Sequence, residues 1–558
     1  MTREAIPASV EYFDLGTHAR TVTTASEDAR VWFNRGLVWV YSFHHGEAVH
    51  CFEQTIQHDP SFAMGYWGLA YAVGPNYNKA WERFDRKDLH ICVQRGHEAS
   101  QKALELSGNA TPLEQGLCRA IVERFPRDTP LSPEDYGTVN CAYADAMKPV
   151  YEQFGADLDI ATLYADALMN VTPWALWDLF TGKANPKART TEVQTVLETA
   201  LTQTGAYRHP GLLHLYIHFI EMSPTPEKGI YAADHLRDLV PDAGHMHHMP
   251  THLDILIGDW RASIRSNYRS TLADDRYAAK AGHNNFYTFY RLHDYHSLVY
   301  AAMFAGQKRT ALDAVTRMEA SIPESLLRTQ SPPMADWIEH FVAIRLHVMV
   351  RFGIPNPYAI TTATTHYARA LAHAATNDIP SARSEQALFL AARERVPPTR
   401  RAYNSKALDM LAVGIPMLTG EIEYRAGSYE VAFAALQEAI ELEDRLPYSE
   451  PWAWMQPVRH AYAALKLEQG EVEEAARTYR ADLGLDESLI RPRRHPNNVW
   501  ALHGYHECLV RLGKTEEAKA IEPARNVALA GADIPIRASC FCRLEVLQDA
   551  TCCGGKSC

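Results

Sequence analysis

The amino-acid sequence predicts an all-α protein built from stacked antiparallel helix pairs, a helical-repeat solenoid. Apolar residues recur at i, i+3, i+4 and i+7 from about residue 28 to about residue 530, and alternation with period two is scarce. Near the carboxyl end, a glycine with an alanine five residues later recurs every 43 residues, at Gly427, Gly470 and Gly513. A fixed period of this kind indicates a repeat architecture.

The first repeat follows an irregular segment, residues 1–27. The residues at the characteristic offsets of a tetratricopeptide unit are Trp32, Gly36, Trp39, Ala48, Phe52 and Pro60. Small residues let the two helices of a pair approach closely, and Pro60 ends the second helix. Because 43 residues exceed the 34 of a standard unit, longer helices or linkers are predicted. We expect one TPR-like solenoid over residues 28–530.

A histidine-rich site is predicted at the centre of the solenoid, over residues 209–296. Residues 212–222 contain neither glycine nor proline and are predicted to form a helix that ends at Ser223. On this helix His214, His218 and Glu221 stand at i, i+4 and i+7, within roughly 60° of one another. Two imidazoles and a carboxylate on one helix face form half of a metal site.

A second group of histidines follows the next turn. A new helix is predicted to begin at Pro250, because proline is favoured in the first turn of a helix. His252 then falls in that first turn. We expect His245, His248 and His252 to converge on the first group from this turn. The further predicted ligands, one repeat later, are His293 and His296. The alternative is a set of hydrogen-bonded core histidines, the commoner role of a buried imidazole.

Imidazole and carboxylate ligands suit a transition-metal ion such as Zn, Cu or Fe. The ion would support hydrolysis, or oxidation of a small molecule if it is redox-active. Tyr287 and Tyr290 are candidate proton donors or substrate contacts, and Asp294 is a candidate for orienting a ligand histidine. Trp174 and Trp177 are expected on one helix face, in the core or in a pocket wall. The sequence contains no nucleophile elbow, P-loop or dinucleotide fingerprint.

Residues 531–558 are predicted to form a cysteine-rich, flexible tail. Its thiols are Cys540, Cys542, Cys552, Cys553 and Cys558. These closely spaced thiols are candidate ligands for a soft ion such as Cu(I), Zn or As(III). The alternative is a disordered tail whose thiols have no role.

Charge and hydropathy limit the partners. The net charge of −12 argues against non-specific binding to nucleic acid, which needs a basic surface. No run of 18 apolar residues predicts a membrane span, and no apolar segment follows a basic start. A cytoplasmic location is therefore expected.

The chain resembles an uncharacterised family of tetratricopeptide-repeat (TPR) proteins of about this length from bacteria and fungi. The stretches that carry the resemblance are residues 33–54, 66–78, 209–223 and 248–260. It covers most of residues 25–520, and the cysteine-rich tail lies outside it. The resemblance implies a helical-repeat fold and no particular activity.

Three functions remain open from the sequence. The first is a metal-dependent enzyme acting on a small molecule inside the solenoid, which the clustered imidazoles favour. The second is a scaffold that binds a peptide or protein partner in the concave groove, which the fold alone favours. The third is a soft-metal handling protein that uses the histidine cluster and the cysteine tail.

Overall fold

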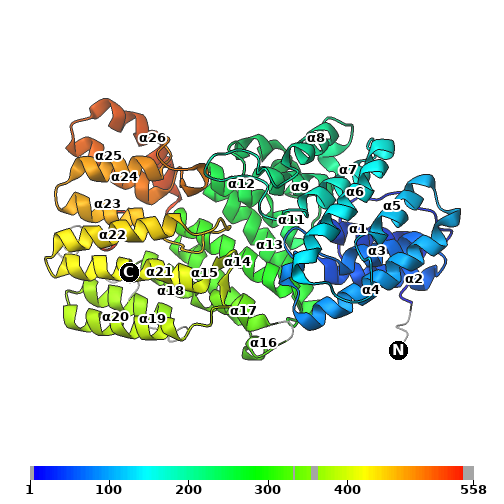
Figure 1. Ribbon diagram of the computed structural model, residues 1–558. Helices are drawn as coiled ribbons and strands as arrows, with labels where there is room; N and C mark the ends of the chain where they lie inside the picture. The colour runs from blue at the N-terminus through cyan, green and yellow to red at the C-terminus, as the bar shows by residue number, and fades with distance from the viewer. Residues whose placement is uncertain (1–4, 331–332, 353–361, 544–558) are drawn as a thin grey trace. The chain divides into compact units, whose positions relative to one another are not determined.

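The computed structural model describes residues 5–330, 333–352 and 362–543, and its regular secondary structure is almost entirely helical (Figure 1). Within these ranges the only strands are β1 (Arg401–Ala402) and β2 (Ser405–Lys406), which pair antiparallel. The all-α prediction is confirmed. In the same ranges, no helix combines the length and the apolar character that crossing a bilayer requires.

The chain divides into two compact units, and the division falls within α12 (Pro250–Ile257), α13 (Trp260–Ala281) and α14 (Tyr287–Phe304). The first unit contains the described residues of Met1–Leu253, Arg269–Arg291 and Gln330–Pro333. The second contains those of Asp254–Tyr268, Leu292–Thr329 and Met334–Cys558.

The other α-helices of the first unit are α1 (Glu27–Tyr41), α2 (His45–His58), α3 (Ala63–Val73), α4 (Arg86–Leu106), α5 (Pro112–Val122), α6 (Tyr136–Phe154), α7 (Leu158–Met169), α8 (Thr190–Leu201), α9 (Pro210–Ile220), α10 (Ile230–Leu236) and α11 (Gly244–His248). Short 3-10 helices lie at Trp81–Arg83, Ser107–Asn109, Pro133–Asp135, Ala206–Arg208 and Pro226–Gly229.

The second unit continues with α15 (Lys308–Ala320), α16 (Glu324–Leu327), α17 (Met334–Ile338), α18 (Ile344–Arg351), α19 (Thr362–Ala375), α20 (Ile379–Glu394), α21 (Ala407–Arg425), α22 (Tyr429–Asp444), α23 (Val458–Glu468), α24 (Val472–Asp482), α25 (Val499–Arg511) and α26 (Thr515–Gly531). Its 3-10 helices lie at Glu339–Ala343 and Arg491–Arg493.

The first helix pair shows why its small residues are needed. Helix α1 packs on α2, and α2 packs on α3. A Cβ atom added at Gly36 would lie 2.8 Å from the Phe52 ring, and one added at Gly68 would lie 2.2 Å from it. The ring of Phe52 therefore fills a space that exists only because both flanking helices carry glycine there.

The 43-residue register marks the turn inside each carboxyl-terminal helix pair. Gly427, Gly470 and Gly513 have φ values of 83°, 81° and 68°, the left-handed conformation that glycine adopts readily at a helix end. The alanines five residues later are buried at the start of the second helix of each pair, where a larger side chain would separate the helices. The pairs α21–α22, α23–α24 and α25–α26 confirm the predicted TPR-like repeat.

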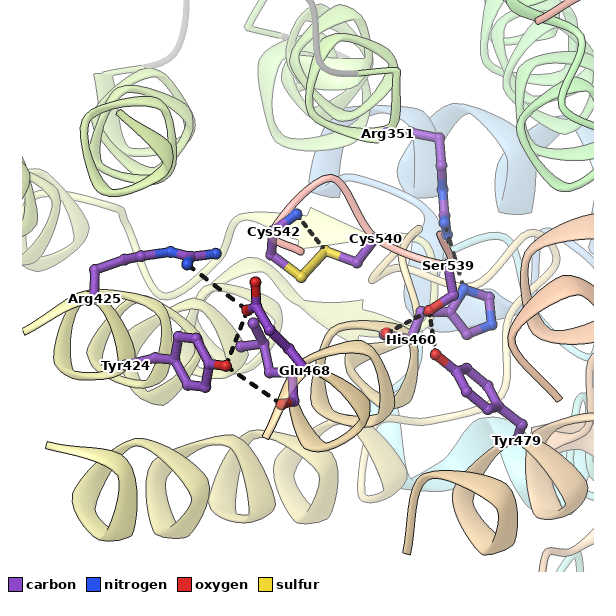
Figure 2. The surroundings of a disulfide bond; sticks show 10 residues. Arg351, Tyr424, Arg425, His460, Glu468, Tyr479, Ser539, Cys540 and Cys542 are labelled. Atoms are coloured by element: carbon purple, nitrogen blue, oxygen red, sulfur yellow. Dashed lines mark hydrogen bonds and ion pairs between the residues drawn. A yellow bond between two sulfur atoms is a disulfide. The ribbon is translucent and has the colours of Figure 1, made fainter. Parts of the chain in front are cut away.

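The last described segment packs on the second unit, whereas the sequence predicts a flexible tail from residue 531. Ser539 is 1% exposed and Arg543 is 2% exposed. Ser539 Oγ accepts a hydrogen bond from the Tyr479 hydroxyl at 2.6 Å and donates one to the His460 carbonyl at 2.9 Å (Figure 2). Arg543 donates to both carboxylate oxygens of Glu507, at 2.7 and 3.0 Å. Polar contacts that hydropathy does not reveal hold this segment in place.

Two of the predicted soft-metal thiols, Cys540 and Cys542, are joined to each other in a disulfide (Figure 2). Soft-metal binding by this pair therefore applies to the reduced chain. The other three predicted thiols, Cys552, Cys553 and Cys558, lie outside the described residues.

Candidate metal centre in the first unit

Helix α9 carries the first histidine group, and its start is fixed by a histidine. His209 precedes Pro210 at the first helical position, and its Nδ1 accepts a hydrogen bond from the backbone N–H of Leu212 at 3.0 Å. Every residue from Pro210 to Ile220 is buried. A helix is therefore present where one was predicted over residues 212–222, but it runs from Pro210 to Ile220, two residues earlier at each end, and it is wholly buried.

His214 and His218 each use one ring nitrogen within the protein and leave the other without a hydrogen-bond partner. His214 Nδ1 donates to the Tyr41 carbonyl at 2.5 Å, and His218 Nδ1 donates to Glu221 Oε1 at 2.7 Å. Both Nε2 atoms are buried, and neither has a hydrogen-bond partner among the residues that the structure describes. A metal-binding histidine typically donates its second ring N–H to a carbonyl or a carboxylate, which is the arrangement found for both residues.

His245, on α11, supplies the third imidazole. Both of its ring nitrogens are buried and lack a hydrogen-bond partner within the described part of the chain. One ring nitrogen each from His214, His218 and His245 lie within 4.8 Å of one another. Nitrogens bound to one tetrahedral ion at about 2.0–2.1 Å would stand roughly 3.3 Å apart. Small side-chain movements would therefore bring the three rings onto a single ion.

Glu221 links the two histidine groups. Its Oε1 accepts from His218, and its Oε2 accepts from His252 Nδ1 at 2.6 Å. His252 Nε2 lies 2.8 Å from His248 Nε2. A ligand atom each from His218, Glu221 and His252 also fall within 4.8 Å of one another. In this arrangement the Glu221 carboxylate orients two imidazoles. That Glu221 also binds the metal directly stays a prediction.

The charge states of these groups favour metal binding. Burial lowers the pKa of His214 well below its usual value, and nearby His218 lowers it further. Burial likewise lowers the pKa values of His218 and His245. Burial raises the pKa of Glu221, but the charge of His252 and the hydrogen bonds from His218 and His252 outweigh it, so the pKa falls to about 2. Neutral imidazoles beside an ionised carboxylate are the forms that bind or support a metal ion.

Aromatic rings surround the imidazoles. The His218 ring centre lies 5.1 Å from Tyr77 and 5.7 Å from Trp174, and the His245 ring centre lies 4.9 Å from Tyr290. The helix expected around Trp174 is a series of turns, in which Trp174 has a φ of 60°. Trp174 packs against His218 as one of these rings, and its predicted role in a pocket wall stays a prediction.

Phe43 is a neighbour of the site that sequence analysis missed. Its ring centre lies 4.3 Å from that of His214, 5.6 Å from His218 and 5.8 Å from His245. Phe43 occupies the turn between α1 and α2, far from the histidines in sequence, and no local motif marks it.

Tyr287, a predicted catalytic residue, is part of the support of the site. Its hydroxyl donates to Asp274 Oδ1 at 2.8 Å and accepts from the backbone N–H of His245 at 3.4 Å. Its ring stacks on His44 with centres 3.6 Å apart. These contacts fix the start of α11, and a catalytic role for Tyr287 stays a prediction.

Three further predicted residues, His293, Asp294 and His296, belong to the second unit. All three are buried. His296 Nδ1 is hydrogen-bonded to the Tyr403 hydroxyl at 2.7 Å, and its Nε2 lies 3.0 Å from Met455 Sδ. Both ring nitrogens of His296 therefore have partners within its own unit. The predicted convergence of His293 with the first group stays a prediction, as does the role of Asp294.

A second polar cluster, centred on Asp159, escaped sequence analysis because its members are scattered along the chain. Asp159 Oδ1 accepts from the Tyr41 hydroxyl at 2.6 Å and lies 3.0 Å from His209 Nε2 and 3.1 Å from His18 Nε2. Its Oδ2 pairs with Arg20 at 2.7 Å. This cluster joins the irregular amino-terminal segment to α7 and α9, because His18 and Arg20 come from that segment, Asp159 from α7 and His209 from the start of α9.

Comparisons with known proteins give fold-level likeness only. No protein-family model matches the chain, and no curated protein is detectably similar in sequence. The crystal structure of yeast Tom70 is similar over 90% of each chain, with 11% identity and a TM-score of 0.29. The Cut9–Hcn1 hetero-tetramer structure of APC/C matches 87% of this chain and 96% of that chain, with 11% identity and a TM-score of 0.25.

A third solved structure, Naa15/Naa10 bound to HypK-THB, matches 90% of this chain and 70% of that chain. The identity is 12% and the TM-score 0.20. Likeness at these levels carries no argument about partners or activity.

Proposed function

We propose that this chain is a helical-repeat binding protein whose first unit holds a transition-metal ion. The metal proposal rests on the two ring nitrogens of each α9 histidine, one of which is hydrogen-bonded while the other has no partner among the described residues. His214 and His218 each donate Nδ1–H inside the protein and keep a buried Nε2 without a partner. An unpaired buried nitrogen is unfavourable, and a metal ion on these atoms and His245 would remove that penalty.

The ligand set suits Zn, Cu or Fe, because imidazole binds all three. The three imidazoles are at most 1% exposed, which favours an ion that stabilises the repeat over an ion that meets a substrate. When bound, such an ion would supply Lewis acidity or redox chemistry. Metal-dependent activity on a small molecule is therefore the less favoured role of this ion, and we propose a cytoplasmic location for the chain.

Partner binding is the second candidate function. Stacked helix pairs present extended surfaces that commonly bind peptides or proteins. In the second unit, such pairs already hold a non-helical segment, because residues 533–543 contact α23, α24 and α25 through the side chains of Ser539 and Arg543. We propose that a non-helical peptide of a partner binds these repeats in the same manner.

Metal content tests the first proposal. The full-length chain, produced without a histidine tag or chelator, is expected to contain about one equivalent of a single transition metal by elemental analysis. His218→Ala should lower that content at least tenfold, because it removes one of the three ligands and the hydrogen bond that Glu221 accepts from His218. Far-ultraviolet circular dichroism should remain that of a helical protein.

His235→Ala is the matched control. His235 is exposed on α10 of the same unit, and its Nδ1 is hydrogen-bonded to the Tyr231 carbonyl at 2.8 Å. This variant should keep the metal content of the parent chain. Metal-free parent protein that also fails to take up Zn²⁺, Cu²⁺ or Fe²⁺ would refute the proposal, as would equal metal content in the His218 and His235 variants.

A further inference from the structure

The second unit contains a cavity that is separate from the residues of the candidate metal centre. Its volume is about 730 Å³, within the usual range of small-molecule sites. Helices α18, α19, α21 and α23 and the segment 539–542 supply most of its lining. The large apolar side chains in its walls are Leu346, Met349, Leu371, Met417, Trp454 and Phe541. Charged residues also line it, so the ligand it suits depends on which of their polar atoms are available.

Most of the charged side chains in the lining already have partners. Glu385 accepts a hydrogen bond from His366 Nδ1 and lies 3.8 Å from Arg369. His373 Nδ1 lies 3.3 Å from Asp378. These groups are therefore engaged with one another or with neighbouring side chains of the same unit.

Arg351 also lines the cavity, but two of its three guanidinium nitrogens do not reach the open space. Its Nη1 donates to His460 Nδ1 at 3.3 Å. Its Nε and Nη2 are fully buried. The paired N–H groups on that edge are therefore out of reach of a molecule in the cavity.

Glu421 is an acid of the lining without a partner. It lies on α21 one turn after Met417, and both residues line the cavity. Glu421 is 5% exposed, yet no hydrogen bond or ion pair with any described residue engages its carboxylate. Neither oxygen is sealed in the interior, so the accessible part of the carboxylate faces the cavity that Glu421 lines.

The neighbouring charges do not neutralise Glu421. Arg425 follows one turn later on α21, but its Nη1 lies 3.8 Å from Glu468 (Figure 2). Burial raises the pKa of Glu421 to about 7, the Arg425 charge opposes this rise, and the Glu468 charge adds to it. A cation placed on the carboxylate would favour its ionised form and offset the cost of burial.

Two aromatic residues of the same lining also suit a cation. The ring centres of Tyr367 and Trp454 lie 5.3 Å apart. Burial raises the pKa of Tyr367 and the Glu421 charge raises it further, so the hydroxyl lies within electrostatic reach of the carboxylate. This hydroxyl has no hydrogen-bond partner among the described residues and can accept one. The faces of aromatic rings attract organic ammonium ions.

We propose that this cavity binds a small organic amine with an apolar body. The ammonium group lies on the Glu421 carboxylate and within reach of the Tyr367 hydroxyl, and the apolar body lies among the apolar walls. An organic anion is repelled by the ionised carboxylate, and a neutral alcohol gains only an ordinary hydrogen bond there.

Isothermal titration of the full-length chain at pH 8 with three ligands of one shape tests this assignment. The ligands are 4-phenylbutylamine, 4-phenylbutan-1-ol and 4-phenylbutanoate. The amine should bind at least about tenfold more tightly than the alcohol, because its hydrogen bond to the carboxylate is charge-assisted. The carboxylate ligand should bind more weakly than the alcohol.

Glu421→Gln should remove the preference for the amine over the alcohol, while alcohol affinity stays within about threefold of the parent value. Retained alcohol binding shows that the cavity of the variant is intact. Tyr367→Phe should weaken amine binding by about two- to tenfold, because one neutral acceptor is lost. Glu423→Gln is the matched control, since Glu423 lies on the same helix, pairs with Arg383 at 2.8 Å and does not line the cavity.

The pH dependence of binding gives a second readout on the parent chain. Amine affinity should rise by about tenfold from pH 6 to pH 8, because Glu421 ionises across this interval while an alkylamine, whose pKa is about 10, stays protonated. In Glu421→Gln the amine affinity should change by less than about twofold over the same interval.

Four results would overturn the proposal. The first is equal binding of the amine and the alcohol by the parent chain. The second is a preference for the amine that survives in Glu421→Gln, and the third is its loss in Glu423→Gln. The fourth is an amine affinity of the parent chain that does not change between pH 6 and pH 8. None of these results depends on the metal centre, whose residues lie in the first unit.

Discussion

Glu221 holds the histidine cluster together because each of its oxygens accepts a hydrogen bond from a different element. His218 comes from α9 itself, and His252 comes from α12. Both imidazoles donate Nδ1–H to the carboxylate, so both direct Nε2 away from it. A single buried acid thereby sets the tautomer and the orientation of two rings, the role that carboxylates often have behind metal-binding histidines.

Replacing this acid tests the role of Glu221 at the residue scale. Glu221→Gln should weaken metal affinity by about ten- to a hundredfold, because the two imidazoles donate to different oxygens and the amide NH2 that replaces one of them cannot accept. Competition with a chromophoric chelator measures the change in affinity. Glu227→Gln, an exposed glutamate of the same unit, should leave it unaltered. Affinity within twofold of the parent chain in Glu221→Gln would show that Glu221 does not support the ligands.

At the scale of elements, each carboxyl-terminal helix pair depends on a neighbour to cover its inner face. Helices α23, α24 and α25 pack in series, and the segment 533–543 supplies further contacts to all three. The backbone also takes part, because the Arg537 carbonyl lies 3.0 Å from His503 Nε2. The segment therefore acts as a bound peptide that belongs to the same chain.

Truncation tests this role of the segment. A chain ending at Ala532 should unfold at a lower temperature than a chain ending at Arg543, because it loses the Arg543–Glu507 pair and the buried Ser539 hydrogen bonds. Differential scanning calorimetry of the two chains measures the shift. The sequence-based expectation of a flexible tail requires the same melting temperature for both.

Rescue in trans extends the same test to partner binding. A synthetic peptide of residues 533–543 should bind the chain that ends at Ala532 and raise its melting temperature with increasing concentration. The same peptide with Arg543→Ala should bind at least about fivefold more weakly, because Glu507 loses its partner. No difference between the two peptides would show that Arg543 does not anchor the segment.

At the scale of the whole molecule, both units bury neutral histidines. Burial lowers the pKa of His44 in the first unit to about 3, and that of His347 in the second to about 4. Both values lie below about 6.5, the ordinary value of an unfolded chain. At a pH between the folded and the unfolded pKa of these histidines, the unfolded chain binds more protons than the folded one. The free energy of unfolding therefore falls as the pH falls.

The metal-free protein should therefore lose stability as the pH falls from about 6.5 towards 4. Each such imidazole contributes a slope of up to about 1.4 kcal/mol per pH unit in this window. Urea unfolding at pH 7.5, 6.0 and 5.0 measures it. His347→Phe replaces the imidazole with a ring that cannot titrate. In this variant the free energy of unfolding should fall less steeply with pH, in the unfolding transition that includes the second unit. Parallel pH profiles for parent and variant would contradict this explanation.

The sequence by itself determined the class of fold. Helical periodicity and the Gly427, Gly470 and Gly513 register report local properties, namely which face is apolar and where a left-handed turn ends a helix. Such signals act within a few residues, so they survive without knowledge of the tertiary structure. The stripe of His214, His218 and Glu221 was predictable for the same reason, because helix geometry alone places them on one face.

Only the tertiary structure decided what those residues do. In the folded chain His214 Nδ1 donates to the Tyr41 carbonyl, and Glu221 accepts from two imidazoles. The Nε2 atoms of His214 and His218 therefore remain without a hydrogen-bond partner among the described residues. The tertiary structure also buried Ser539 and Arg543 in a segment that composition presents as flexible. These outcomes depend on contacts between residues far apart in the chain, and hydrogen-bond direction and burial at such contacts leave no periodic trace in the sequence.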